Sequence, residues 1–232
     1  MPDLRNQSLD ATSDRPVYKL SFIRRCHQLL AYGYAELESA TLHAEQEPAI
    51  TGELVRAMKS VQERADAPRW MIYLHIADDP PVNAPGRFGK RRRRVDIEFE
   101  RSERGRRPRF QCEAKRLYRN DSLEKYLGED GLGRFLAGDY SRDEDVAGML
   151  GYVQVRSVAD WSGDLRSALN TNRVRHEVSS SEPLTSANLG AELVSTWLSE
   201  HRRPTVGRPI AIYHSLLLFH GGWTAPPQAD SI

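Results

Sequence analysis

The chain of 232 residues has no apolar run long enough to cross a bilayer, and its longest, SLLLF at 215–219, suits a buried strand or helix. Residues 1–16 are polar and lack the apolar core of a secretory signal, so we expect a disordered N-terminal tail there. The two cysteines, Cys26 and Cys112, form neither a disulfide framework nor a metal-ligand pattern. These absences predict a reduced, cytoplasmic protein with no membrane partner.

Several common signatures of function are also missing from the sequence. The seven histidines form no HxH or HxxxH pattern, and the glycine-rich segment 128–138 fits no P-loop. No nucleophile elbow surrounds Ser179–Ser181, which argues against a serine hydrolase. We find no internal repeat, helix-turn-helix or zinc finger. With 39% hydrophobic and 28% charged residues, the chain has an ordinary globular composition, and we expect one domain over 17–225.

Hydrophobic periodicity predicts an α/β fold. Apolar residues at helical spacing predict four helices, at 17–40, 51–66 (capped by Thr51), 143–158 and 186–201. Runs rich in β-branched and aromatic residues predict strands at 70–78 and 209–219. Two further segments, 94–100 and 109–115, alternate apolar and polar residues and predict a hairpin, whereas 168–185 is expected to be a loop or irregular strand. This order predicts a central mixed β-sheet flanked by helices.

The polar face of the predicted hairpin carries acids and a lysine. If strands 94–100 and 109–115 pair, Asp96 comes to lie beside Glu113 and Lys115, because side chains alternate between the two faces of a strand. Two converging carboxylates repel each other, and a hard divalent cation such as Mg²⁺ relieves the repulsion with oxygen ligands. The carbonyl of Ala114 is a plausible extra ligand. Glu98 and Glu100 share the face of Asp96, so either could take its role.

Basic residues precede this face. The block GRFGKRRRR at 86–94 leads directly into Asp96 and places Arg91, Arg92, Arg93 and Arg94 next to it, and Arg134 is a further candidate. Arginines hold phosphate oxygens, and a lysine beside a bound metal can orient or deprotonate a water. Metal, lysine and arginines together favour phosphodiester hydrolysis over acyl or glycosyl chemistry. The alternative for the basic block is a solvated loop that keeps the surface soluble.

Asp96 followed by Glu113-Ala114-Lys115 resembles the PD-(D/E)XK nuclease superfamily, with its restriction-endonuclease-like core of a helix, a three-stranded meander, a crossover helix and a further strand. The resemblance covers about 50–220, with Val95 in place of the usual proline. It implies that Asp96 and Glu113 bind Mg²⁺ (or Mn²⁺) and that Lys115 assists the attacking water. It also suggests Glu53, on the first core helix, as a further metal ligand. Tyr152 and Gln154, on the helix after the E-x-K motif, would contact nucleic acid.

The sequence therefore predicts a metal-dependent endonuclease that cuts DNA, with RNA a less favoured substrate. A partner protein of a bacterial anti-phage or restriction system, or a second copy of the chain, would supply specificity; this expectation rests on analogy. Two alternatives remain. One is a catalytically silent nucleic-acid-binding or scaffolding protein on the same fold, and the other is an interaction domain with a charged hairpin. Tyr152 and Gln154 could also simply pack within their helix.

Overall fold

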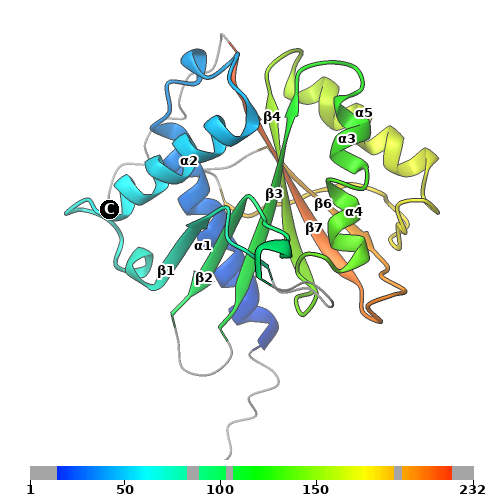
Figure 1. Cartoon of the computed structure of the whole chain (residues 1–232), viewed down its shortest axis with the longest axis horizontal. Coiled ribbons are helices and arrows are strands. Elements are labelled where there is room, and N and C mark those ends of the chain that lie inside the picture. The colour runs from blue at the N-terminus through cyan, green and yellow to red at the C-terminus, as the bar shows by residue number, and fades with distance from the viewer. Residues whose placement is uncertain (1–14, 83–88, 103–106, 191–194, 221–232) are drawn as a thin grey trace, which may run out of the picture.

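The computed structural model describes residues 15–82, 89–102, 107–190 and 195–220, which build one seven-stranded sheet with helices on both faces (Figure 1). The strand order is β1-β2-β3-β4-β7-β6-β5. Their bounds are β1 Leu74–Asp78, β2 Ile97–Arg101, β3 Arg109–Leu117, β4 Val146–Val153, β5 Thr185–Ser186, β6 Thr196–His201 and β7 Ile210–Leu218. The prediction of an α/β fold with a central mixed sheet is confirmed.

The sheet combines a parallel centre with antiparallel flanks. Strands β3, β4 and β7 run parallel to one another, while β1-β2-β3 form an antiparallel meander and β5-β6-β7 an antiparallel flank. The two antiparallel sides need only short connections, whereas the parallel step from β3 to β4 needs a crossover. Helices α3 (Ser122–Leu127) and α4 (Leu132–Ala137) provide that crossover.

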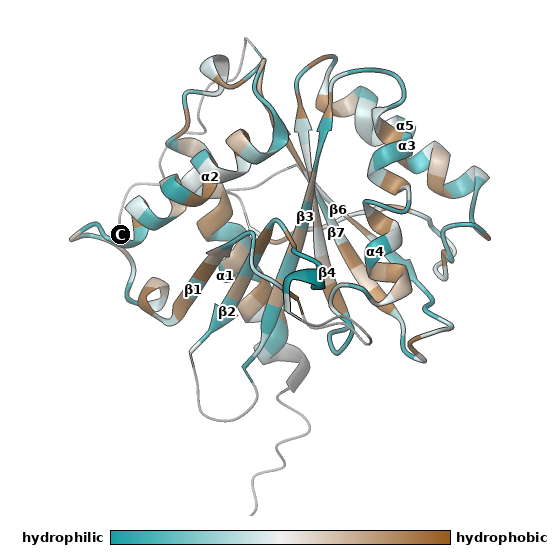
Figure 2. Cartoon of the chain, viewed as in Figure 1, coloured by the Kyte–Doolittle hydropathy of each residue, from teal (hydrophilic) through white to brown (hydrophobic). Residues whose placement is uncertain are grey.

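Each face of the sheet has its own hydrophobic core. Helices α1 (Arg15–Ala35) and α2 (Glu47–Gln62) contribute to one core, which includes Phe99 and Phe110 of the meander. On the other face α3, α4 and α5 (Val158–Thr171) pack over β4 and β7. Figure 2 shows the hydrophobic colour along the central strands and hydrophilic patches on the helices. Among the described residues, no helix is both long enough and apolar enough to pass through a membrane.

The two alternating segments pair as predicted, although the first strand begins at Ile97 and not at residue 94. β2 pairs antiparallel with β3, in a register that places Ile97 opposite Cys112 and Phe99 opposite Phe110. These four residues lie in the core beneath α1 and α2, whereas Leu117 at the end of β3 packs in the core of the other face. β7 also agrees with the predicted strand 209–219. The connection between β2 and β3 includes residues 103–106, which lie outside the described residues.

The predicted helix at 143–158 is wrong, because residues 146–153 of this segment form β4, a central strand. β4 is buried on both faces, so its sequence is almost continuously apolar and shows no alternation that would mark it as a strand. Its glycines permit close packing against the neighbouring strands. A Cβ on Gly148 would lie 2.6 Å from the Cys112 sulfur, and one on Gly151 would lie 2.5 Å from a Leu216 methyl group.

The predictions for the C-terminal half also need correction. The described end of the helix predicted at 186–201 is strand β6, which pairs with β7. The loop predicted from 168 begins inside a helix, because α5 extends to Thr171. A capping box between Ser157 and Asp160 starts α5, where each side chain accepts a hydrogen bond from the other residue's backbone N–H.

Element boundaries differ from prediction at the N-terminal side as well. α1 begins at Arg15, inside the predicted tail, and residues 1–14 of that tail lie outside the described residues. α2 begins at Glu47, so Thr51 lies inside the helix and does not cap it. Pro48 occupies the first turn, where its missing N–H costs no hydrogen bond. This earlier start brings Glu47 to the N-terminal end of α2, next to β3.

Candidate active site

The candidate site forms where β2 and β3 separate. The last paired residues are Ile97 and Cys112, and the chain bends at Asp96, immediately before β2. Asp96 Oδ2 accepts a hydrogen bond of 2.6 Å from the backbone N–H of Ala114, and this bond takes the place of a ladder bond between the strands. The bend also sends Val95 into the core of the opposite face, away from Ile97 and Phe99. Asp96 is thereby fixed against the E-x-K segment of β3.

Lys115 connects the acids of the site. Its ammonium nitrogen lies 2.8 Å from Glu113 Oε1, 3.2 Å from Glu47 Oε1 and 2.7 Å from the Ala114 carbonyl oxygen. Asp96 also acts on Lys115 and Glu113 electrostatically. The structure therefore brings together the three residues that the sequence predicted, Asp96, Glu113 and Lys115. The predicted ligand oxygen of Ala114 is here an acceptor for Lys115.

The acid that α2 contributes is Glu47, which the sequence prediction missed. Glu53, the residue predicted for this place, is instead ion-paired with Arg56 of the same helix. One guanidinium nitrogen of Arg56 lies 2.8 Å from Glu53 Oε1 and 2.7 Å from Oε2. Glu53 lies six positions after Glu47, which directs the two side chains about 120° apart around the helix. Pro48 next to an acid, just ahead of an apolar helical pattern, was the available signal for the helix start.

Burial raises the pKa values of both central acids. The pKa of Asp96 rises to about 6, chiefly because burial disfavours its charged form, while the Ala114 N–H and Lys115 act in the opposite direction. Burial, and then the charge of Asp96, raise the pKa of Glu113 to about 8, against the effect of Lys115. Burial lowers the pKa of Lys115, but the carboxylates of Glu113, Glu47 and Asp96 outweigh it and raise that pKa overall.

Glu113 has an oxygen that lacks a partner. Its side chain is buried, and Oε2 accepts no hydrogen bond from the protein although Oε1 is held by Lys115. Burial without a donor disfavours the charged form of Glu113, and a cation at Oε2 would favour it. No three His, Cys, Asp or Glu residues within the described ranges form a cluster that could hold a metal by themselves. The two carboxyl groups of Asp96 and Glu113 are a donor set of the size that Mg²⁺ uses when it binds one or two carboxylates and keeps several waters.

The two other acids of β2 are engaged elsewhere. Glu98 Oε2 accepts a hydrogen bond of 2.6 Å from the Gln111 amide, whose own oxygen is bonded to the backbone N–H of Ser141. Glu100 pairs with Arg107 at 2.8 Å and Arg109 at 2.9 Å; these arginines lower its pKa even though burial acts to raise it. Neither acid competes with Asp96 for the site.

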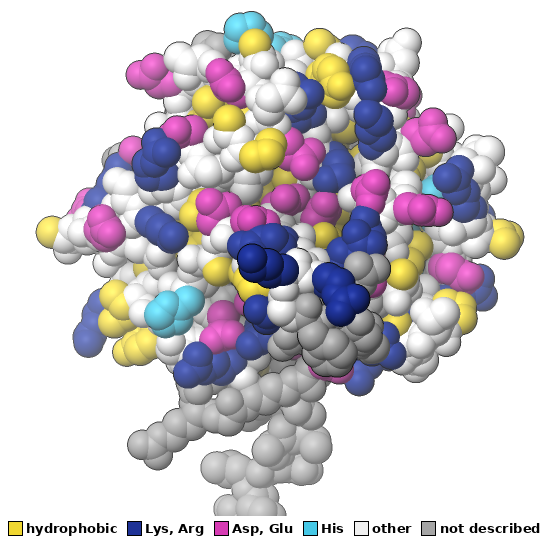
Figure 3. Space-filling view, in the orientation of Figure 1, with side chains coloured by type: hydrophobic (Ala, Val, Ile, Leu, Met, Phe, Trp, Pro, Cys, Tyr) yellow, Lys and Arg dark blue, Asp and Glu magenta, His cyan; other side chains and the backbone are white. Residues whose placement is uncertain are grey.

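The predicted arginines take different positions around this centre. Arg91 is exposed at the end of a short 3₁₀ turn, Gly89–Arg91, and the Arg92 side chain lies over that turn, with its Nε 3.4 Å from the Gly89 carbonyl. Arg94 pairs with Asp79 at 2.5 Å. Figure 3 shows acidic side chains across the middle of this face of the molecule with Lys and Arg side chains directly beside them.

Arg93 and Arg134 belong to one ionic network next to the acids. Both guanidinium groups approach Asp139 Oδ2, Arg93 Nε at 3.4 Å and Arg134 at 3.2 Å, and Arg134 also pairs with Asp130. The buried phenol of Tyr140 lies among these groups. Burial and the charges of Glu113 and Asp96 raise its pKa, while Arg134 and Arg93 act to lower it. These two arginines therefore share the electrostatic environment of the acids.

Tyr152 and Gln154 do not lie on a helix as predicted. Tyr152 is fully buried in β4, where its hydroxyl shares a hydrogen bond of 2.9 Å with Thr51 of α2, so it has no surface for nucleic acid. Gln154 follows β4 and is also buried. Its amide nitrogen donates to the carbonyl oxygens of Glu45 at 2.9 Å and Leu42 at 3.4 Å. Both residues support the position of α2 and therefore of Glu47.

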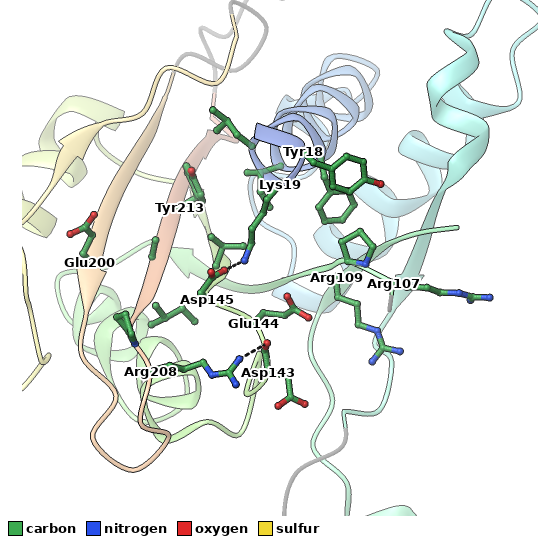
Figure 4. Close-up of a pocket in the computed structure, with 18 of the residues that line it drawn as sticks. Tyr18, Lys19, Arg107, Arg109, Asp143, Glu144, Asp145, Glu200, Arg208 and Tyr213 are labelled. Atoms are coloured by element: carbon green, nitrogen blue, oxygen red, sulfur yellow. Dashed lines mark hydrogen bonds and ion pairs between the residues drawn. The ribbon is translucent and has the colours of Figure 1, made fainter. Parts of the chain in front are cut away.

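A cavity of about 780 Å³ lies away from this site, at the edge of the sheet where β3, β4 and β7 begin (Figure 4). Many of its charged side chains are engaged with neighbours. Lys19 pairs with Asp145, and Arg208 donates to the Asp143 carbonyl at 2.8 Å. Arg107 and Arg109 are held by Glu100. Its lining does not include Asp96, Glu113 or Lys115.

No protein-family model matches the chain, and neither a curated protein nor a solved structure matches it.

Proposed function

We propose that the chain is a metal-dependent nuclease that hydrolyses phosphodiester bonds of DNA. The observation that carries the proposal is the convergence of Asp96, Glu113 and Lys115, in which the buried Glu113 Oε2 has no hydrogen-bond donor among the described residues. An acceptor of this kind suits a cation. Arg93, whose Nε lies 3.4 Å from Asp139 Oδ2, acts on the same Tyr140 phenol as these acids, and its guanidinium suits a phosphate.

The arrangement of the elements supports a restriction-endonuclease-like core. Helix α2 precedes the β1-β2-β3 meander, α3 and α4 cross over, and β4 returns parallel to β3. This order agrees with the PD-(D/E)XK nucleases that the Asp96 and Glu113-Ala114-Lys115 motif resembles. The crossover and the following strand lie earlier in the chain than the sequence predicted, so the agreement now extends over residues 47–153.

Each side chain has a distinct part in the proposed reaction. Asp96 and Glu113 hold Mg²⁺ (or Mn²⁺), and Glu47 is close enough to Lys115 to adjust the charge of the site. The bound ion would polarise a phosphoryl oxygen and acidify a water. The Lys115 ammonium, 2.8 Å from Glu113 Oε1, is placed beside the ion to orient the attacking water and to stabilise charge that develops on the phosphate. Arg93 and Arg134 contact the phosphate.

Plasmid nicking tests the proposal. In the presence of Mg²⁺ or Mn²⁺ we expect the wild type to cut DNA and Lys115→Ala to lose at least about 100-fold in rate, because an aligned charged group in such a site contributes on that order. Lys59→Ala, which changes an exposed lysine of α2, is the matched control and should cut like the wild type. If neither cation supports cleavage of DNA, the proposal is wrong; cleavage of RNA alone would transfer the activity to RNA.

A catalytically silent nucleic-acid-binding protein is the second candidate. In its favour, Lys115 already neutralises Glu113 and Glu47 and bonds to the Ala114 carbonyl, so three oxygens of the site are occupied without a metal. Calorimetric titration with Mn²⁺ separates the two. Binding of the ion, lost in Asp96→Asn, favours the nuclease. Binding of DNA without any response to the ion favours the silent protein. A role in defence against foreign DNA, with a partner protein or second copy, extends the proposal by analogy.

A further inference from the structure

A cluster of two arginines and a tyrosine follows the candidate site along β3. The Arg116 guanidinium carbon lies 4.2 Å from the centre of the Tyr118 ring, and that of Arg119 lies 5.1 Å from it. Tyr118 and Arg116 are half-buried and Arg119 is exposed. None of these residues belongs to the core. Arg116 lies near the end of β3, and Tyr118 and Arg119 lie in the turn between β3 and α3, at the upper end of the sheet in Figure 1.

The cluster is held in one arrangement by the surrounding backbone. Buried Ser122 accepts hydrogen bonds through its hydroxyl from the backbone N–H groups of Tyr118 at 3.2 Å and Arg119 at 3.1 Å. Arg116 donates to the Glu45 carbonyl at 3.2 Å, and Arg119 pairs with Asp121 at 2.5 Å. Side chains fixed before binding lose little conformational entropy when they meet a ligand.

The cluster and the candidate site both contact the chain at the start of α2. Arg116 is bonded to the Glu45 carbonyl, two residues before the Glu47 that contacts Lys115. Residues on a strand advance by about 3.3 Å each, so Tyr118, three residues after Lys115 and just past the end of β3, lies about 10 Å farther along the chain. A nucleic-acid strand with a phosphate at Lys115 would have its neighbouring nucleotides within reach of Tyr118.

We propose that Arg116, Tyr118 and Arg119 bind an unpaired nucleotide next to the phosphodiester bond that is cut. This inference rests on the proposed function and adds a substrate class to it: single strands and frayed ends. A guanidinium stacked on an aromatic ring keeps its N–H groups directed sideways, where they can hold phosphate oxygens. Aromatic rings and guanidinium planes both stack on unpaired bases, whereas the bases of a duplex are already stacked and paired.

Fluorescence anisotropy with labelled oligonucleotides tests this proposal. Binding is measured in the Lys115→Ala background with Mg²⁺, using a 20-nucleotide single strand of DNA, its RNA counterpart and the blunt DNA duplex. We expect Tyr118→Leu to weaken binding of the single strands about tenfold and of the duplex less than threefold, since stacking contributes about 1–3 kcal/mol per base. Tyr118→Phe keeps the aromatic ring, so it should bind the single strands with an affinity within twofold of the protein that retains Tyr118.

The arginine arm of the experiment uses a matched control. Arg119→Gln should weaken the binding of all three ligands. It should also reduce the slope of log affinity against log salt by about one, the contribution of one phosphate contact. Arg166 of α5 is also exposed and ion-paired, in its case with Glu182, so Arg166→Gln is the matched control. It should change neither the affinities nor the salt slope. Thermal melting of each variant confirms that it is folded.

Two outcomes overturn this inference. One is unchanged binding of the single strands by Tyr118→Leu, which would mean that the cluster only stabilises its turn. The other is an equal loss on single strand and duplex. If either result is found while the wild type still cuts in the presence of Mg²⁺, this inference is wrong and the nuclease proposal stands. Conversely, if the wild type never cuts but Tyr118→Leu still weakens single-strand binding, the nuclease proposal is wrong and the nucleotide site stands.

Discussion

At the scale of single residues, the candidate site is a place where the fold is under electrostatic strain. Asp96 and Glu113 are both buried enough to raise their pKa values, and Lys115 offsets only part of this cost. Such a pair does not contribute to the stability of the metal-free protein at neutral pH. It is the kind of local conflict expected at a functional site and not in a core that only has to fold.

Replacing Glu113 by glutamine should therefore stabilise the metal-free protein at high pH. The pKa of Glu113 is about 8 in the folded protein against 4.5 as the ordinary value, so between these values the folded state holds a proton that the unfolded state has lost. Stability from this group is fully present below pH 4.5 and is lost as the pH rises through 8. Urea unfolding in EDTA should show Glu113→Gln more stable than the wild type by about 1–3 kcal/mol at pH 8.5.

The same comparison at pH 4 should give almost no difference, because below the ordinary value of 4.5 Glu113 is mostly protonated in both the folded and the unfolded state. Glu63→Gln, an exposed glutamate after α2, provides the control and should behave like the wild type at both pH values. A wild type that remains the more stable protein at pH 8.5 would show that Lys115 offsets the full cost of the buried charge.

At the scale of elements, the position of Glu47 depends on contacts with the loop before α2. Gln154 donates to the carbonyl oxygens of Glu45 and Leu42 from the end of β4. Gln154→Leu should leave both carbonyls without that donor and lower the free energy of unfolding by about 1–3 kcal/mol. Hydrogen exchange should accelerate in the first turn of α2. Gln46→Leu is the control, since exposed Gln46 makes no side-chain cap bond; equal effects of the two variants would contradict the argument.

The same scale explains what the sequence could and could not predict. In β2 and β3 apolar residues alternate with polar ones, so alternation revealed both strands and brought Asp96, Glu113 and Lys115 together correctly. β4 is buried on both faces, and its apolar run cannot be distinguished from a buried helix by periodicity. The bend at Asp96 and the start of α2 at Glu47 depend on tertiary contacts with β3, which no local pattern contains.

At the scale of the whole molecule, buried histidines impose a second pH dependence, of opposite sign. His214 bonds to Tyr126 at 3.0 Å and to the Ser199 hydroxyl at 2.7 Å, and Ser199 also bonds to His201 at 2.6 Å. His27 is buried in the other core. Burial lowers the pKa values of all three, to about 4 for His27, 4 for His201 and 3 for His214, from an ordinary 6.5.

Because these pKa values are lower in the folded state, the unfolded chain binds more protons between about pH 6.5 and 4, and stability must fall as the pH falls through that range. The raised pKa values of Asp96 and Glu113 act against this loss, so the Asp96→Asn/Glu113→Gln double variant isolates the histidines. In that variant the free energy of unfolding in urea should drop by at least about 1.4 kcal/mol from pH 6 to pH 5, the equivalent of one proton per pH unit. The wild type should lose less over the same interval, since its two acids favour the folded state as they take up protons. An equal and shallow loss in both proteins would mean that the histidines carry protons inside the fold.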